Sequence, residues 1–90
     1  MMYKIIYSQK AEEDLARLLK DEQPAYKKAL KLIAELYEHP RTGTGHPEPL
    51  KGRPNQWSRH ITQKHRLVYE INDDEVIVLV LTAYKHYNDK

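Results

Sequence analysis

The longest apolar run of the chain is the feature that most constrains its fold. It extends from Val76 to Leu81, alternates valine with other aliphatic residues, and is far shorter than the roughly 20 residues of a membrane-spanning helix. A continuous apolar strand needs cover on at least one face, so we expect Val76–Tyr84 to be a central strand of a sheet. Other segments must supply its partner strands and its cover.

Two segments in the first half of the chain have the helical period that such cover requires. Apolar residues recur at helical spacing within Ala11–Lys20 and again within Ala25–Glu38, which gives each segment one apolar stripe. Ser8 can cap the first helix, Pro24 suits the first turn of the second, and Pro40 ends it. We interpret both stripes as the core-facing sides of an antiparallel helix pair.

The remaining segments favour strands separated by a loop. Runs of β-branched and aromatic residues predict strands over Tyr3–Tyr7, Gln56–Thr62 and Arg66–Ile71. The segment Arg41–Pro54 contains all three glycines and is predicted to be a loop. The sequence therefore predicts an α+β fold with the helices on one face of a small sheet, whose last three strands are antiparallel. The 90 residues suit one domain, residues 1–90.

Composition excludes several classes of site. The chain has no cysteine, which excludes disulfides and zinc sites built on thiolates. Its N-terminal residues lack the pattern of a signal peptide, and we expect a cytoplasmic protein without membrane association. The histidines His60, His65 and His86 have no convincing zinc spacing, so we expect neither a metal nor another cofactor.

Positive charge is concentrated between Pro49 and Tyr69. This stretch has five Lys or Arg residues and no Asp or Glu, whereas the rest of the chain carries 10 basic and 13 acidic residues. Such a segment attracts polyanions such as RNA, although it can also be a solvated basic surface. If Gln63-Lys64 is a two-residue hairpin loop, Arg59 and Arg66 project from the same face and can clamp a phosphate.

Two further side chains could transfer protons. Glu48 lies between Pro47 and Pro49, whose fixed φ angles would hold its carboxylate rigidly, as a general base requires. His86 follows the last predicted strand, and histidine is the usual proton shuttle near neutral pH. Taken alone, each residue is better explained as an ordinary surface side chain.

Several pieces of the sequence together resemble the signature of the YoeB-type toxins, which belong to the RelE/ParE superfamily. They are GHPEPLK at 45–51, WSRHIT at 57–62 and HRLVY at 65–69, and the pair His86-Tyr87 matches that family's ending. The resemblance covers nearly the whole chain. The tail Asn88-Asp89-Lys90 departs from the family's short ending and puts the placement of His86 in question.

The resemblance implies a compact RelE-like fold, similar to the microbial ribonucleases, and the toxin of a type II toxin–antitoxin module. It implies a metal-free endoribonuclease that cuts messenger RNA on the ribosome and so inhibits translation. Carried over by motif position, Glu48 would be the general base on the ribose 2′-hydroxyl, His86 the general acid, and Arg66 a catalytic cation. The implied substrate contacts are Lys51, Arg59 and Tyr87.

The implied partners are a cognate antitoxin, the ribosome with its message, and a second copy of the chain. Three alternatives remain open from the sequence. One is a toxin of the same superfamily that does not cleave RNA. Another is a nucleic-acid-binding module without activity, which would keep the basic stretch but would not need Glu48. The third is a structural subunit, for which no feature of the sequence argues specifically.

Overall fold

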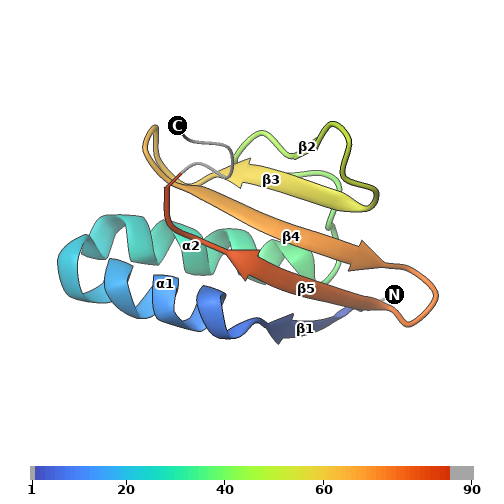
Figure 1. The fold of residues 1–90 in the computed structure, drawn as a ribbon, viewed down its shortest axis with the longest axis horizontal. Coiled ribbons are helices and arrows are strands. Elements are labelled where there is room, and N and C mark those ends of the chain that lie inside the picture. The colour runs from blue at the N-terminus through green and yellow to red at the C-terminus, as the bar shows by residue number, and fades with distance from the viewer. Residues whose placement is uncertain (1, 86–90) are drawn as a thin grey trace.

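The structure, a computed structural model, describes residues 2–85. Within this range, a pair of helices lies against one face of a five-stranded sheet (Figure 1). The strand order is β1-β5-β4-β3-β2. The predicted α+β fold is confirmed. In chain order the elements are β1 (Lys4–Tyr7), α1 (Gln9–Asp21), α2 (Gln23–Leu36), β2 (Glu48–Pro49), β3 (Gln56–His60), β4 (Arg66–Asn72) and β5 (Ile77–Thr82).

The apolar strand β5 is central, as predicted. It pairs parallel with β1 and antiparallel with β4, and β4 in turn pairs antiparallel with β3. The strand begins at Ile77 rather than Val76, because Val76 has a φ of 56° and belongs to the preceding turn. The parallel β1–β5 pairing requires a crossover between the two strands, and α1 and α2 lie within that crossover (Figure 1).

The local signals that predict the helices act as expected. The Ser8 hydroxyl accepts a hydrogen bond from the Ala11 N–H at 2.9 Å and caps α1. The chain breaks at Glu22, whose φ of −146° is not helical, and α2 then starts with Pro24 in its first turn. Both helices begin less than a turn before their predicted starts, since their first residues lie outside the apolar stripes.

The apolar stripes of the helices meet the sheet in one core. Leu18, Leu32 and Leu36 are fully buried, and so are Leu67 and Tyr69 of β4. Within residues 2–85, fourteen buried apolar residues make up this core, namely Ala11, Leu18, Ala25, Ala29, Leu32, Ile33, Leu36, Ile61, Leu67, Tyr69, Ile71, Val78, Val80 and Ala83. The interpretation of both stripes as core packing is confirmed.

We expect Leu32→Ala to lower the free energy of unfolding by about 2–5 kcal/mol, because it removes buried methyl groups and leaves a cavity. Leu30→Ala in the same helix is the matched control, since Leu30 is 43% exposed. The control should change stability by about 0.5 kcal/mol or little more. Urea denaturation measures both variants, and equal losses would contradict this assignment of the core.

One strand has no signal in the sequence. Glu48 and Pro49 form the short edge strand β2, in which Glu48 pairs with Ser58 and Pro49 with Trp57 of β3. The prediction of a loop over these residues is wrong, because two residues flanked by prolines give no strand pattern. An edge position tolerates Pro49, because an edge strand leaves N–H positions that need no partner.

The predicted pairing of β3 with β4 is wrong by one residue. His60 lies opposite Arg66 and Arg59 opposite Leu67, and the connection runs from Ile61 to His65 instead of being the two residues Gln63-Lys64. The Thr62 hydroxyl stabilises this longer turn by accepting the backbone N–H groups of residues 64 and 65 at 3.2 and 3.1 Å. A shift of one residue exchanges the two faces of a strand. Arg59 therefore faces the helices, and His60 faces the opposite side.

Candidate functional site

Glu48 lies at the edge of the sheet face opposite the helices. Its partner Ser58 alternates along β3 with the inward-facing Arg59, so Ser58 and Glu48 share the face opposite the helices. The Glu48 side chain is 51% exposed, and its Oε2 atom lies 3.8 Å from Nε2 of His46. Its carboxylate is therefore open to a ligand and has a histidine beside it.

Gly45 lets the chain approach β3 closely before it reaches Glu48. It has a φ of +85°, and a Cβ atom there would lie 3.0 Å from the carbonyl oxygen of His60 and 3.1 Å from Cδ2 of Leu32. The Gly45 carbonyl accepts the backbone N–H of His60 at 2.7 Å. This contact fixes the loop against β3 three residues before Glu48.

Arg66 lies on the same face of the sheet as Glu48. It pairs with His60, which follows Ser58 at the alternate position of β3, so all these side chains leave the sheet in the same direction. Its Nη1 donates to the carbonyl oxygens of Thr62 and Gln63 at 2.7 and 3.1 Å and to that of His65 at 3.2 Å. The turn thus holds one nitrogen of a half-buried guanidinium on the face that also carries the carboxylate.

His60 is a residue of this face that was not among the predicted site residues. It lies opposite Arg66, and its ring centroid is 5.8 Å from that of His46, edge to face. Alternation of side chains along β3 would have placed His60 on the face of Arg66 if the pairing of β3 with β4 had been predicted with the turn one residue longer. Together, His46, Glu48, His60 and Arg66 place two imidazoles, a carboxylate and a guanidinium on one side of the sheet.

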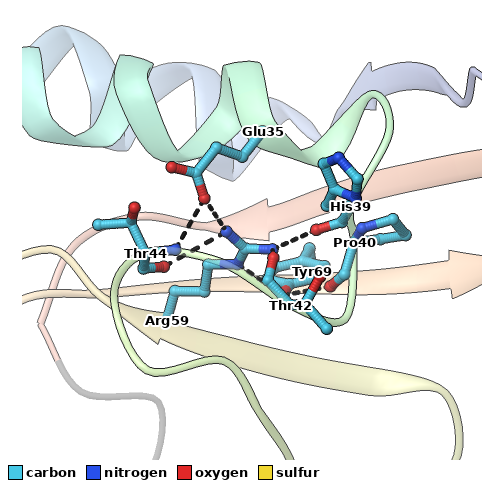
Figure 2. Close-up of polar contacts among 7 residues, drawn as sticks. All are labelled: Glu35, His39, Pro40, Thr42, Thr44, Arg59 and Tyr69. Carbon is cyan, nitrogen blue, oxygen red and sulfur yellow. Dashed lines mark hydrogen bonds and ion pairs between the residues drawn. The ribbon is translucent and has the colours of Figure 1, made fainter.

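Arg59 does not belong to this face, which corrects its predicted role as a phosphate ligand. Its side chain has no exposed area, and Figure 2 shows its guanidinium enclosed between α2 and the loop that follows this helix. Nη1 donates to Oε1 of Glu35 at 2.8 Å, and Nε donates to the Tyr69 hydroxyl at 3.0 Å. The remaining acceptors are the backbone carbonyl oxygens of His39, Thr42 and Thr44.

The Arg59 contacts fix the loop that leads to Glu48. Tyr69 donates its hydroxyl hydrogen to the carbonyl of Pro40 at 2.7 Å, and Glu35 accepts the backbone N–H of Thr44 at 2.8 Å (Figure 2). Burial raises the pKa of Glu35, but the hydrogen bonds from Thr44 and Arg59 outweigh burial and hold this pKa below its usual value. Glu35 is therefore a carboxylate partner of the buried guanidinium.

The other predicted site residues are only partly placed. Lys51 is exposed in the turn after β2 and forms no hydrogen bond or ion pair with Glu48 or Arg66 in residues 2–85. His86 and Tyr87 lie outside the described residues. The carbonyl of Lys85, the last described residue, accepts the backbone N–H of Arg66 at 3.0 Å. The chain therefore reaches Arg66 one residue before His86.

The described residues also bear on metal and membrane association. Within residues 2–85, no group of three or more His, Asp or Glu side chains is arranged to hold a metal ion. Neither helix in that range is long and apolar enough to cross a membrane.

Comparison with protein families and curated proteins gives consistent matches along the chain. The family model of the YoeB-like toxin of bacterial type II toxin–antitoxin systems matches residues 7–87. Toxin YoeB of Mycobacterium bovis is 38% identical over 87 residues, which cover 96% of this chain and all of that protein. Toxin YoeB of Escherichia coli is 37% identical over 76 residues, 83% of this chain and 90% of its own length.

Solved structures have the same fold. A YoeB/ParE toxin from Agrobacterium tumefaciens has a TM-score of 0.86 at 30% identity, covering 93% of this chain and 99% of that one. The YoeB dimer from Staphylococcus aureus has a TM-score of 0.83 at 28% identity, covering 97% of this chain and all of that one. From the family match and these relatives, the chain belongs to the YoeB-like toxins of bacterial type II toxin–antitoxin systems.

Proposed function

We propose that this toxin is an endoribonuclease that cuts messenger RNA on the ribosome and thereby inhibits translation. The observation that carries the proposal is the presence of Glu48 and Arg66 on one sheet face, with the chain end that leads to His86 bonded to the Arg66 backbone. A base, a cation and an acid are what cleavage of RNA by its own 2′-hydroxyl requires. Because its substrate is on the ribosome, the protein would act in the cytoplasm.

In the proposed reaction, Glu48 takes the proton of a ribose 2′-hydroxyl. The freed oxygen attacks the neighbouring phosphorus, and the bond from that phosphorus to the 5′-oxygen of the next nucleotide breaks. His86 gives a proton to this leaving oxygen. The products are a 2′,3′-cyclic phosphate on one fragment and a free 5′-hydroxyl on the other, so protons and charge balance without any cofactor.

The geometry of Arg66 supports its role as the cation that stabilises the phosphorane. The turn carbonyls all bind Nη1, which orients the plane of the guanidinium before substrate arrives. Fixed donors of this kind stabilise developing charge without reorganising during the reaction. We assign His60, opposite Arg66, as a second phosphate contact in the place first given to Arg59. Lys51 would add long-range attraction, and Tyr87 would orient a nucleotide.

Relatives also suggest the partners. Solved structures include the YoeB–YefM complex of Staphylococcus aureus, a toxin–antitoxin pair, and a YoeB dimer from the same organism. We infer that this chain likewise forms a homodimer and binds a cognate antitoxin. The antitoxin would neutralise the toxin by covering or disturbing the face that carries Glu48 and Arg66.

Glu48→Gln should reduce cleavage of ribosome-bound message by about 10²–10⁴-fold, because glutamine keeps the shape of the side chain but cannot take a proton. It should also relieve the growth arrest that expression of the toxin causes. The cleavage rate is measured by primer extension on stalled ribosomes, with folding checked by circular dichroism.

The matched control is Glu70→Gln, which removes a carboxylate from the same sheet face, four positions beyond Arg66 on β4. Glu70 accepts a hydrogen bond from Gln56 at 3.3 Å and has no proposed role in the reaction. This variant should cleave at nearly the wild-type rate. Undiminished cleavage by a folded Glu48→Gln protein would remove Glu48 from its role, and binding without cleavage by the wild type would favour an inactive binding module.

A further inference from the structure

His65 is a fully buried histidine that uses both ring nitrogens. Its Nε2 lies 2.8 Å from Oε2 of Glu22, and its Nδ1 lies 2.9 Å from the backbone nitrogen of Lys85. A backbone N–H can only donate, so Nδ1 must be the unprotonated acceptor, and Nε2 carries the hydrogen that Glu22 accepts. The ring also packs against Tyr84, with the ring centroids 4.4 Å apart. These contacts fix the tautomer and the orientation of the imidazole.

Three side chains hold the end of β5 and the residues that follow this strand. The Ser8 hydroxyl donates to the Leu81 carbonyl at 2.8 Å, and the buried Asp14 accepts the Ala83 N–H at 3.0 Å. His65 accepts the Lys85 N–H, and the Lys85 carbonyl accepts the N–H of Arg66. Chain ends are usually poorly ordered unless they are tied down in this way. Alternate residues from 81 to 85 are therefore anchored up to the last described position.

Lys85 has a backbone conformation that needs such anchoring. Its φ of 61° lies in the left-handed region, which is uncommon for a residue with a side chain. Conformations of this kind persist when surrounding contacts determine them, and they concentrate at functional sites. The two backbone hydrogen bonds of Lys85, to His65 and from Arg66, provide these contacts.

We propose that Glu22 and His65 form a positioning pair that fixes the Lys85 backbone and thereby aims the general acid His86, which follows it in the chain. The inference rests on the proposed function, because it gives the pair a purpose in RNA cleavage. Neither residue would touch the substrate. Glu22 would orient His65, and His65 would hold the backbone of Lys85, the residue before His86 in the chain.

Glu22 is suited to this role by its place between the two helices. The hydrogen bond from His65 is the main reason that the pKa of Glu22 lies below its usual value, and Lys64, whose Nζ is 3.8 Å away, acts in the same direction. The carboxylate is therefore ionised at neutral pH and keeps the hydrogen of His65 on Nε2. This leaves Nδ1 free to accept the Lys85 N–H.

Two substitutions separate the two hydrogen bonds of His65. In His65→Asn, the side-chain oxygen can replace Nδ1 as the acceptor for Lys85, but nothing reaches Glu22. In His65→Gln, the side-chain NH₂ can replace Nε2 as the donor to Glu22, but the acceptor for Lys85 is lost. Both variants remove the same buried ring, so a purely structural role of His65 predicts similar losses of stability and activity in both.

We expect His65→Gln to lower kcat for ribosome-bound message by about 10–100-fold with little change in KM, because small displacements of a reacting group have effects of this size. His65→Asn should retain most of the wild-type kcat. Hydrogen exchange followed by NMR gives a second readout that does not depend on catalysis. The Lys85 amide should exchange slowly in the wild type and in His65→Asn, and rapidly in His65→Gln.

The outcomes distinguish this inference from the proposed function. A wild-type protein that cuts no message overturns both. A wild type that cleaves normally, together with equal kcat values in the two variants, overturns the positioning role alone. Rapid exchange of the Lys85 amide in the wild type also overturns it. Loss of kcat and of Lys85 protection in His65→Gln, with rescue of both in His65→Asn, supports it.

Discussion

Arg59→Ala should lower the free energy of unfolding by about 3–5 kcal/mol, the usual cost of removing one partner of a buried ion pair. The substitution leaves the Glu35 carboxylate, the Tyr69 hydroxyl and several loop carbonyls without their donor (Figure 2). Since Glu35 is only 25% exposed, water can replace only some of the lost interaction. Chemical denaturation measures this effect directly.

Arg53→Ala is the matched control for Arg59→Ala. Arg53 is an exposed arginine of the same basic stretch, and its removal should change stability by only about 0.5 kcal/mol. Arg59→Lys should fall in between, because an ammonium keeps the charge but cannot present the planar fork of donors that reaches Glu35 and Tyr69 together. If Arg59→Ala were as stable as the control while RNA binding was lost, Arg59 would return to the substrate site.

Local signals explain why most of the fold was predictable. The Ser8 cap, the break at Glu22 and the apolar stripes through Leu18 and Leu32 depend on residues near one another in the sequence, and the structure has each of them. The continuous apolar composition of β5 similarly predicted a central strand, and β5 lies between β1 and β4. These elements position the sheet face on which the candidate site lies.

The site was less predictable because it depends on register. The β3–β4 connection is longer than predicted, and the Thr62 hydroxyl stabilises it by accepting two backbone N–H groups of the turn. The longer connection exchanges the faces of Arg59 and His60. The presence of a basic residue in a strand does not indicate which face of the sheet its side chain lies on. A buried arginine also requires partners such as Glu35, which lie far away in the sequence. Composition identified the basic stretch, but packing decides which of its residues are exposed.

Contacts between segments that are far apart in the chain could also not be predicted from the sequence. The pairing of β2 with β3 turns an apparent loop glutamate into a residue of the sheet edge, and the hydrogen bond that the Lys85 N–H donates to His65 links residues that are 20 positions apart. Neither interaction has a periodic signature. The residues alone suggested Glu48 and Arg66 as candidates, and the resemblance to a toxin family implied their catalytic roles. The structure places both on one face.

A message with a single 2′-deoxy nucleotide on the 5′ side of the cleavage position should be bound normally and not cut. In the proposed mechanism the 2′-hydroxyl is the nucleophile, so its removal eliminates the reaction rather than slowing one step. All phosphates remain, and phosphate contacts contribute most of the affinity of a basic surface. Affinity should therefore change little, while cleavage falls to the uncatalysed background.

The experiment uses ribosomes programmed with matched messages, one unmodified and one with the deoxy substitution, in the presence of a chelator. A third message with the substitution one nucleotide downstream is the control, because it keeps the nucleophile and should be cut at the normal rate. The unmodified message should yield a 2′,3′-cyclic phosphate or a 3′-phosphate and a free 5′-hydroxyl. A 5′-phosphate product, a metal requirement or normal cleavage of the first deoxy message would each contradict a mechanism in which Glu48 activates the 2′-hydroxyl.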